Sequence, residues 1–381
     1  MKMLVLGAGL QGCACTYDLL QNPAVATVTL ADLRPDDLPA FLSGGAWGDR
    51  LRAVRLDVTD SAAVLETMQG HDAVMSAIPY YFNGPMARAA VESGCHFADL
   101  GGNTEIVLEQ KRLHERAVAT GVSVVPDCGL APGMVNILAA EGIRRLDTAE
   151  RVKIFVGGLP QNPEPPLNYQ IVYSLEGALD YYTTPSWVLR GGKPVQVDAL
   201  SELEPVEFPA PVGTLEAFHT GGGISTLPFA YEGRIEVMEY KTLRYPGHAA
   251  VMRPIRELGL LDSRPVTVKG QAVVPRDLFI AAVHPKLHKP RGRDLVALQV
   301  EVAGQRDGRR STITFRLLDY YDAEHGISAM MRTTGYSLSL TGQMQADGRI
   351  AEKGVHTPDE VVPFRLYVDE LARRGVRIEE L

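Results

Sequence analysis

The chain of 381 residues is longer than one ordinary domain and long enough for two. Its composition, 45% hydrophobic and 22% charged, is typical of a globular protein, and its net charge of −8 argues against a nucleic-acid partner. No apolar stretch reaches the ~20 residues that a membrane span needs, so we expect no membrane partner. The four cysteines are too few for a disulfide framework, and the first expected strand begins at the initiator methionine. We therefore predict a cytoplasmic protein with reduced thiols.

Residues 1–130 alternate between short apolar runs, typical of strands, and longer amphipathic stretches, typical of helices. The expected strands span residues 3–6, 25–31, 53–56, 73–78, 96–99 and 122–126. The expected helices span residues 10–21, 61–68, 85–93 and 104–120. This alternation predicts an α/β domain of the Rossmann type, with a doubly wound parallel sheet and helices on both faces.

A glycine-rich segment, Gly7-Ala-Gly-Leu-Gln-Gly12, joins the first strand to the first helix with dinucleotide-binding spacing. Gly7 permits the tight turn, Gly9 lets backbone amides approach a pyrophosphate, and Gly12 lets the helix pack close to the sheet. The second strand ends at Asp32, where an acid binds the ribose hydroxyls and repels the 2′-phosphate of NADP. We therefore predict NAD as the cofactor, although Arg34 partly offsets that repulsion. The expected cofactor contacts are Gly7, Gly9, Leu10, Gln11, Gly12, Asp32, Arg34, Asp57, Val58, Ala77, Ile78 and Pro79.

Polar residues follow the fourth and fifth strands, at the sheet edge where α/β proteins bind ligands. Pro79 ends the fourth strand, and the loop after it, with Tyr80 and Asn83, would flank the nicotinamide half of the cofactor. Asp99 ends the fifth strand and precedes two glycines. Tyr80 and Asp99 are candidate catalytic bases, and Asn83 is a candidate substrate contact. Packing of Tyr80 beneath the second domain and helix capping by Asp99 are equally good structural alternatives.

The segment after the sixth strand runs from Val125 to Asn136 and has Pro or Gly at nearly every second position. Such a backbone path is typical of places where ligands approach closely. Gly133 and Asn136 open an expected helix over residues 134–146, whose first amides suit a substrate carboxylate. Cys128 is a further candidate substrate contact, although a buried, inert thiol is the commoner role of such a cysteine. Cys13 and Cys15 would point to different faces of the first helix, so no metal site is predicted.

Residues 131–325 are expected to form a second, α+β domain that binds substrate and makes dimer contacts. A strand at 151–156 leads into short strands with turn residues and a helix near 249–260, which predicts a mainly antiparallel sheet. Hairpin turns are predicted at 191–192, 307–308 and 347–348. Arg244 and His248 flank a Pro-Gly turn: Arg244 suits a substrate carboxylate, with surface ion pairing as the alternative, and His248 is a third candidate base.

Helices at 327–345 and 358–374 close the chain. We expect residues 326–381 to pack back on the Rossmann domain, since too few residues remain for a domain of their own. Soluble enzymes of this kind usually form symmetric assemblies, so a homodimer or larger homo-oligomer is also expected.

Several segments together resemble the saccharopine dehydrogenase-like family over nearly the whole chain, and their order and spacing carry the resemblance. These segments are residues 7–12, 77–79, 127–133, 157–160, 165–169, 242–248, 332–336 and 354–359. Within them, Tyr169 is an additional candidate substrate contact.

The resemblance implies an NAD-dependent oxidoreductase that acts on a small amino-acid substrate. Family members acting on secondary amines usually carry an aspartate where this chain has Ala131, and tend to carry a cysteine where it has Val156. The Ala131 form resembles the lysine 6-dehydrogenase branch, which oxidises the ε-amine of L-lysine to an imine that hydrolyses to a semialdehyde and ammonia. Saccharopine or carboxynorspermidine dehydrogenase activity is the alternative within the family. A non-catalytic NAD(H)-binding redox sensor is the alternative from another class.

Overall fold

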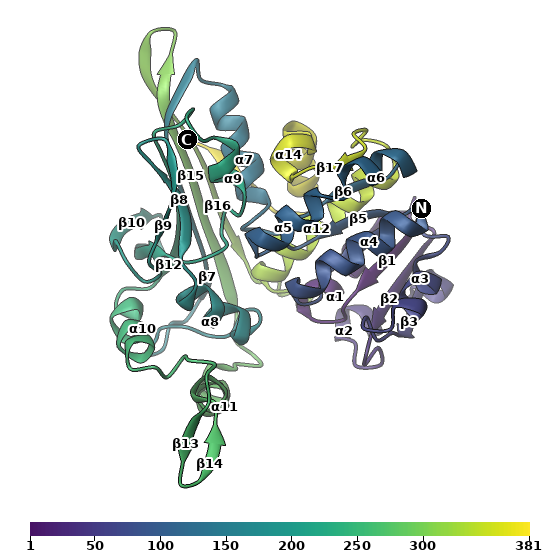
Figure 1. Ribbon diagram of the computed structural model, residues 1–381, viewed down its shortest axis with the longest axis horizontal. Helices are drawn as coiled ribbons and strands as arrows, with labels where there is room; N and C mark the ends of the chain where they lie inside the picture. Colours follow the sequence, from purple (N-terminus) through teal and green to yellow (C-terminus); the bar gives the residue numbers. More distant parts are fainter.

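The computed structural model describes residues 1–381 and shows two sheets, each with its own helices (Figure 1). The first sheet has seven parallel strands in the order β17-β6-β5-β4-β1-β2-β3, which confirms the predicted Rossmann-type arrangement. Its strands are β1 (Lys2–Leu6), β2 (Thr27–Asp32), β3 (Leu51–Arg55), β4 (Ala73–Ser76), β5 (His96–Asp99), β6 (Ser123–Val125) and β17 (Gly354–Val355).

Helices cover both faces of this sheet. They are α1 (Leu10–Gln21), α2 (Ala40–Ser43), α3 (Ser61–Met68), α4 (Asn83–Ser93), α5 (Thr104–Lys111) and α6 (His114–Thr120), with short 3₁₀ turns at Gly48–Arg50 and Tyr80–Phe82. Side chains of β1 alternate between the two faces: Met3 and Val5 join the core beneath α1, whereas Leu4 and Leu6 join the core beneath α3 and α4. All four are fully buried, as expected for a parallel strand covered on both sides.

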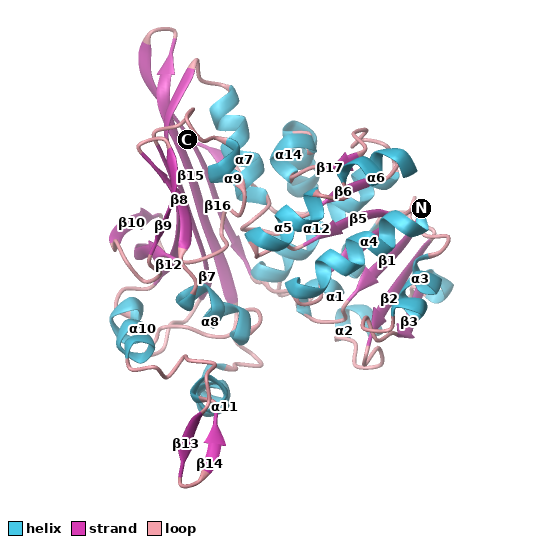
Figure 2. Ribbon diagram, viewed as in Figure 1, coloured by secondary structure: helices cyan, strands magenta, loops and turns pink.

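The second sheet has nine strands and is mainly antiparallel, as predicted, with one parallel pair between β12 and β7. Its strands are β7 (Thr148–Pro160), β8 (Ser186–Arg190), β9 (Lys193–Val197), β10 (Glu204–Phe208), β11 (Gly213–His219), β12 (Val237–Arg244), β15 (Asp294–Arg306), β16 (Arg309–Tyr320) and β18 (Glu379–Glu380). The accompanying helices are α7 (Met134–Arg144), α8 (Leu175–Thr183), α9 (Leu227–Ala230), α10 (His248–Glu257) and α11 (Pro275–Leu287). The hairpin β13 (Val266–Val268) and β14 (Gln271–Val273) projects from the molecule beside α11 (Figure 2).

The chain then returns to the first sheet through α12 (Ala329–Ala346), and it closes with α13 (Pro358–Val361) and α14 (Phe364–Arg373). Helix α12 packs against α1 and against strands β4 and β5. A Cβ on Gly335 would lie 2.6 Å from the Ala14 Cβ, so the glycine allows the two helices to approach closely. Helix α12 therefore connects the second sheet to the helix that carries the glycine-rich segment. No helix is long and apolar enough to cross a lipid bilayer.

Several expected elements differ from the observed ones. The hairpin turn expected at 347–348 is wrong, because Asp347 caps the end of α12 instead. The single helix expected over 358–374 is two helices, since Pro363 lies between α13 and α14 and breaks the helical hydrogen bonding. The helix expected over 104–120 is likewise divided into α5 and α6. Helices α8 and α11 were not predicted, because their residues were assigned to a region of short strands.

Candidate active site

The glycine-rich segment has the geometry that a bound pyrophosphate requires. Gly7 has a φ of +96°, and a Cβ there would lie 2.8 Å from the Ala77 carbonyl oxygen. A Cβ on Gly12 would lie 1.8 Å from the Gly7 carbonyl oxygen, so only glycine lets α1 pack this close to the turn. A Cβ on Gly9, by contrast, would meet nothing within 4 Å. The open space at Gly9 and the uncapped start of α1 at Leu10 leave backbone amides free for a phosphate anion.

Asp32 lies at the carboxyl end of β2, beside this segment. Its Oδ2 accepts a hydrogen bond from the Ala8 amide at 2.7 Å, and its Oδ1 accepts one from the Arg34 amide at 2.8 Å. The carboxylate is therefore fixed where the ribose of a dinucleotide would lie, while the Arg34 side chain is exposed. Asp57 and Val58 follow β3, the next strand of the sheet, and Asp57 is exposed there.

The loop after β4 lies against the same turn. The Ala77 amide donates a hydrogen bond to the Leu6 carbonyl at 2.8 Å, and a Cβ on Gly7 would lie 3.1 Å from the Ile78 Cγ2. The structure thus brings the residues from Gly7 to Gly12 together with Asp32, Ala77 and Ile78 at one edge of the first sheet. These residues suit a dinucleotide, whose nicotinamide end would point toward the second sheet.

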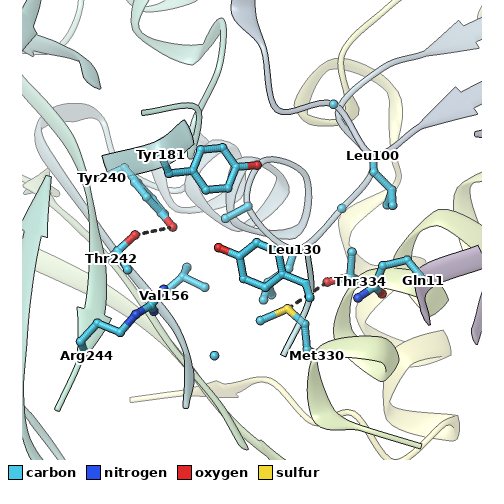
Figure 3. A pocket seen from close by; sticks show the side chains of 15 residues that line it. Gln11, Leu100, Leu130, Val156, Tyr181, Tyr240, Thr242, Arg244, Met330 and Thr334 are labelled. Carbon is cyan, nitrogen blue, oxygen red and sulfur yellow. Dashed lines mark hydrogen bonds between the residues drawn. The ribbon is translucent and has the colours of Figure 1, made fainter. Parts of the chain in front are cut away.

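We call the first sheet with its helices the first unit and the second sheet with its helices the second unit. A cavity of about 180 Å³ lies between them, next to the glycine-rich segment (Figure 3). From the first unit, it is lined by the loops after β5 and β6 and by Gln11; from the second, by the sheet face and residues near α8; helix α12 completes it. The lining residues are Gln11, Leu100, Gly101, Gly129, Leu130, Ala131, Val156, Gly158, Tyr173, Tyr181, Tyr240, Thr242, Arg244, Met330 and Thr334.

Arg244 is the one charged side chain on this wall. It is 3% exposed, and its guanidinium lies 4.9 Å from the centre of the Tyr169 ring. Its Nη1 donates to the Leu243 carbonyl at 2.8 Å and its Nε donates to the Tyr182 hydroxyl at 3.2 Å, whereas its Nη2 makes no hydrogen bond within the protein. A buried guanidinium with a free N–H group is a site for a carboxylate.

His248 lies behind Arg244 and does not line the cavity. Its Nε2 lies 2.9 Å from the Tyr182 hydroxyl and its Nδ1 lies 3.0 Å from the Leu167 carbonyl oxygen. Burial, together with the charge of Arg244, lowers the pKa of His248 to about 3, so the ring stays neutral. The structure therefore places His248 where it supports Tyr182 and Arg244 from behind the cavity wall.

Tyrosines and a threonine form much of the remaining polar wall. Tyr240 is within 3.3 Å of the Thr242 hydroxyl, which in turn lies 2.7 Å from the Thr220 hydroxyl. Burial raises the pKa of Tyr181 above its usual value, so this phenol remains protonated and can donate a hydrogen bond. Tyr173 is the third tyrosine of the wall. Sequence reasoning did not select these residues, because a tyrosine in a region of irregular strands carries no pattern that separates a site residue from a core residue.

Asp99 lies directly behind the loops of the first unit. Asp99 accepts hydrogen bonds from the Gly101 amide at 2.7 Å, the Gln110 side-chain amide at 2.6 Å and the Asp127 amide at 3.2 Å. Burial raises the pKa of Asp99 to about 6, and these donors limit the rise. Asp99 thus fixes the two-glycine turn that lines the cavity, but it is fully buried and does not reach the cavity itself.

The other candidate bases and substrate contacts have structural surroundings. Tyr80 is half-buried, lies edge-on to Tyr81 and does not line the cavity. Asn83 is buried and accepts a hydrogen bond from the Ser76 hydroxyl at 2.8 Å. The Cys128 thiol is buried and points to the Val125 carbonyl oxygen at 3.1 Å. These three side chains are not brought together with Arg244.

Gly133, Asn136 and Tyr169 support the cavity wall from outside. Gly133 has a φ of +127°, and its amide donates to the Asn136 side-chain oxygen at 3.2 Å. The Asn136 side-chain amide donates to the Ile224 carbonyl at 3.3 Å, which ties the start of α7 to the loop between β11 and α9. Tyr169 packs beneath the Arg244 guanidinium.

One cluster elsewhere has ligand types that suit a metal ion. Glu202, His219 and Glu239 bring three potential ligand atoms within 4.8 Å of one another. Arg190 already lies 2.9 Å from Glu202 and 2.6 Å from Glu239, and Lys153 lies 3.3 Å from Glu239. These cations neutralise the carboxylates, so we interpret the cluster as an ion-pair network.

A parallel sheet with a dinucleotide fingerprint, facing a cavity that a second sheet completes, defines a nicotinamide-dinucleotide-dependent oxidoreductase. Two family models match this chain: the saccharopine dehydrogenase NADP binding domain over residues 3–125 and the saccharopine dehydrogenase C-terminal domain over residues 129–376. The chain therefore belongs to the saccharopine dehydrogenase family, as the sequence motifs predicted.

Curated relatives and solved structures agree with this assignment. The chain is 24% identical to the NADP(+)-dependent, L-glutamate-forming saccharopine dehydrogenase of Schizosaccharomyces pombe, over all of this chain and 98% of that protein. It is also 24% identical to mouse mitochondrial alpha-aminoadipic semialdehyde synthase, of which it spans 45%. The apo L-Glu-forming saccharopine dehydrogenase of Saccharomyces cerevisiae has the same fold, with a TM-score of 0.81 at 22% identity over 100% of this chain and 99% of that one. Homospermidine synthase from Legionella pneumophila, solved with NAD, has a TM-score of 0.68 at 12% identity over 100% and 91% of the two chains.

Proposed function

We propose that this member of the family is an NAD-dependent dehydrogenase that oxidises the side-chain amine of a small amino acid, with L-lysine as the substrate. The observation that carries the proposal is the charge of the cavity wall, where Arg244 is the single charged side chain. One buried guanidinium with one free Nη2 suits a substrate with a single carboxylate. L-Lysine has one carboxylate, whereas saccharopine has three.

The cavity wall also supports lysine over saccharopine at two particular positions. Ala131 and Val156 both line the cavity. These are the positions where family members that act on secondary amines usually carry an aspartate and tend to carry a cysteine. This chain therefore presents methyl groups where those enzymes present groups that ionise, and it offers no second charge for a larger, more acidic substrate.

NAD is the proposed cofactor because of Asp32. Its carboxylate is held beside the glycine-rich turn by two backbone amides and would accept hydrogen bonds from both ribose hydroxyls. The same charge would repel the 2′-phosphate of NADP, and the nearby cations are the exposed Arg34 and Arg55, which lies opposite Asp32 on β3. The family model and the fungal relatives carry NADP in their names, so the preference is proposed for this chain from its own residues.

The bound dinucleotide supplies the acceptor for the hydride that leaves the amine-bearing carbon. Arg244 binds the substrate carboxylate and so fixes one end of the molecule. The Tyr182 hydroxyl accepts a hydrogen bond from the guanidinium, and His248 in turn hydrogen-bonds to that hydroxyl. Because Tyr182 and His248 are both buried, they hold the guanidinium in place. Water is excluded from the reacting carbon by the side chains that line the cavity, among them Tyr173 and Tyr181. This exclusion matters because the carbon must lose a hydride before water attacks the resulting imine.

Saccharopine oxidation is the second candidate, because the chain matches full-length enzymes of that name. A screen separates the two. Purified protein is incubated with NAD or NADP and with L-lysine, L-ornithine or saccharopine, and formation of the reduced cofactor is followed by absorbance. We expect turnover with L-lysine and NAD. Turnover with saccharopine and none with lysine would overturn the proposal and favour the second candidate.

A further inference from the structure

The side chain of Asp127 has no role in the function described so far, and its surroundings are unusual. It is fully buried, and neither of its carboxylate oxygens completes a hydrogen bond of full geometry, although the Ser225 hydroxyl and the Gly102 amide lie near them. An ionised carboxylate without a partner in the protein interior costs several kcal/mol in typical cases and is rarely retained without a use. Asp127 also has a φ of +64°, a backbone conformation that an aspartate adopts at a cost.

Asp127 packs against the cavity wall from behind. A Cβ on Gly101 would lie 1.8 Å from Asp127 Oδ1, so the carboxylate is in direct contact with the turn formed by Gly101 and Gly102. Gly101 lines the cavity on its other side. A Cβ on Gly102 would lie 3.1 Å from the Tyr181 hydroxyl, so the same turn separates Asp127 from a polar group of the cavity.

No cationic side chain faces Asp127 to act as its counter-ion. The titratable groups that face it are Asp99, Asp359, Tyr181 and Cys128, and none of them is a cation. The buried hydroxyl of Ser225 also lacks a hydrogen-bond partner. Burial raises the pKa of Asp127 to about 7, and Asp99 and Asp359 add to the rise, whereas Ser225 and the Gly102 amide oppose it.

Arg244 lies on the side of the cavity that the second sheet forms. Leu100 and Gln11 lie across the cavity from it, on the side that the first unit forms (Figure 3). An amino acid whose carboxylate is bound to Arg244 would therefore direct its far end toward the wall in front of Asp127. With lysine, that far end is the reacting amine. Each of the two buried charges would thus be opposite in sign to the end of the substrate that it faces.

We infer that Asp127 stabilises the cationic end of the substrate, opposite Arg244, by acting across the turn of Gly101 and Gly102. This inference rests on the proposed amine oxidation and makes Asp127 a positioning residue, because it does not touch the substrate. The incoming ammonium first releases its proton to solvent. The amine-bearing carbon then loses a hydride to the bound dinucleotide, and the nitrogen lone pair closes a C=N bond. The substrate nitrogen becomes a cationic iminium, whose charge the ionised Asp127 favours.

The first test compares Asp127→Asn with the unchanged protein in the pH dependence of kcat/KM. Besides the limb set by the amine itself, the unchanged protein should lose activity as the pH falls through about 7, where Asp127 takes up a proton. Asp127→Asn should lack this lower inflection, and its kcat/KM at alkaline pH should fall about 10- to 100-fold, the size of a charge interaction across one layer of backbone. Its affinity for NADH should stay within about 2-fold, since Asp127 makes no hydrogen bond to the glycine-rich segment or to Asp32.

A matched control is Asp319→Asn. Burial raises the pKa of Asp319 to about 6 as well, but this carboxylate pairs with Arg332 and does not lie behind the cavity wall. Its replacement should leave the shape of the pH profile unchanged. A second variant, Ser225→Ala, removes a group that favours the ionised form of Asp127, so the lower inflection should move to higher pH. An unchanged profile in both Asp127→Asn and Ser225→Ala would overturn the inference.

A binding measurement separates this inference from the proposed function. Calorimetry on the complex of the protein with NADH compares the binding of L-lysine with that of L-norleucine, which has the same carbon skeleton but lacks the side-chain amine. The unchanged protein should prefer lysine, and Asp127→Asn should lose about 10-fold or more of that preference. If the unchanged protein neither binds nor oxidises lysine, the proposed function fails. If it does both and Asp127→Asn keeps the preference, only the role of Asp127 fails.

Discussion

Replacing Asp127 by asparagine should change how the stability of the protein depends on pH. The carboxyl has a pKa of about 7 in the folded chain and an ordinary value of 3.8. Between these values the folded state holds a proton that the unfolded state releases, so this group makes the protein less stable as the pH rises from about 4 to 7. Asparagine has nearly the same shape and no charge, and it removes this dependence.

The magnitude follows from the pKa difference. Two pH units lie between about pH 5 and the folded-state pKa of about 7, and each is equivalent to about 1.4 kcal/mol. Between pH 5 and pH 8 the unchanged protein therefore loses about 3 kcal/mol of unfolding free energy through this group. The asparagine amide remains buried and costs about 1–3 kcal/mol at every pH, because it too lacks partners. Relative to the unchanged protein, Asp127→Asn should therefore gain about 3 kcal/mol of unfolding free energy between pH 5 and pH 8.

Urea unfolding of both proteins at several pH values between 5 and 8 measures this difference. Buried acids that do not contact Asp127, such as Asp319, titrate in both proteins, so their contributions largely cancel. A free-energy difference that stays constant across this range would refute the reasoning, because it would show that Asp127 is not an uncompensated buried acid.

Three further outcomes are expected from the fingerprint and from the cavity. Gly9→Ala should fold with unchanged stability but bind NAD weakly. Gly12→Ala should lose about 1–3 kcal/mol of unfolding free energy, because a Cβ on Gly12, unlike one on Gly9, would collide with backbone. Equal melting temperatures for the two variants would contradict this difference. Arg244→Met should raise KM for lysine about 10- to 100-fold, and Arg244→Lys should lie between, as initial-rate kinetics would show; an unchanged KM would remove Arg244 from the substrate site. Asp32→Ala should weaken NAD binding about 10-fold or more in fluorescence titrations without weakening NADP binding, while the exposed Asp36→Ala should change neither. A loss of affinity for both cofactors in Asp32→Ala would instead indicate a damaged fold.

Local chemistry made the first unit predictable from the sequence. The alternation of strands and helices has a strong period, and the observed bounds of α1 and α3 are the expected ones. The roles of Gly7 and Gly12 could also be predicted, because each follows from the geometry of one turn. Arg244 was selected because it flanks a Pro-Gly turn and a guanidinium suits a substrate carboxylate, whereas its burial, which argues against surface ion pairing, is visible only in the structure.

The cavity wall was less predictable, because it is assembled from distant segments. Tyr181 and Tyr240 reach the cavity through the packing of α8 and β12 against loops of the first unit, which no local pattern encodes. His248 and Asp99 were selected as bases for their residue type, but burial determines their roles, and burial depends on the complete fold. Asp127 was overlooked among its Pro and Gly neighbours, since its lack of partners is visible only in three dimensions.

The measurement that tests the central claim most directly is cofactor reduction with L-lysine as the only amine. The proposed function predicts NADH formation with release of one ammonia per NADH, faster with NAD than with NADP, and its loss in Arg244→Met. The absence of NADH formation with lysine, together with clear turnover of saccharopine, would contradict the claim. It would show that a single buried guanidinium does not define the substrate of this site.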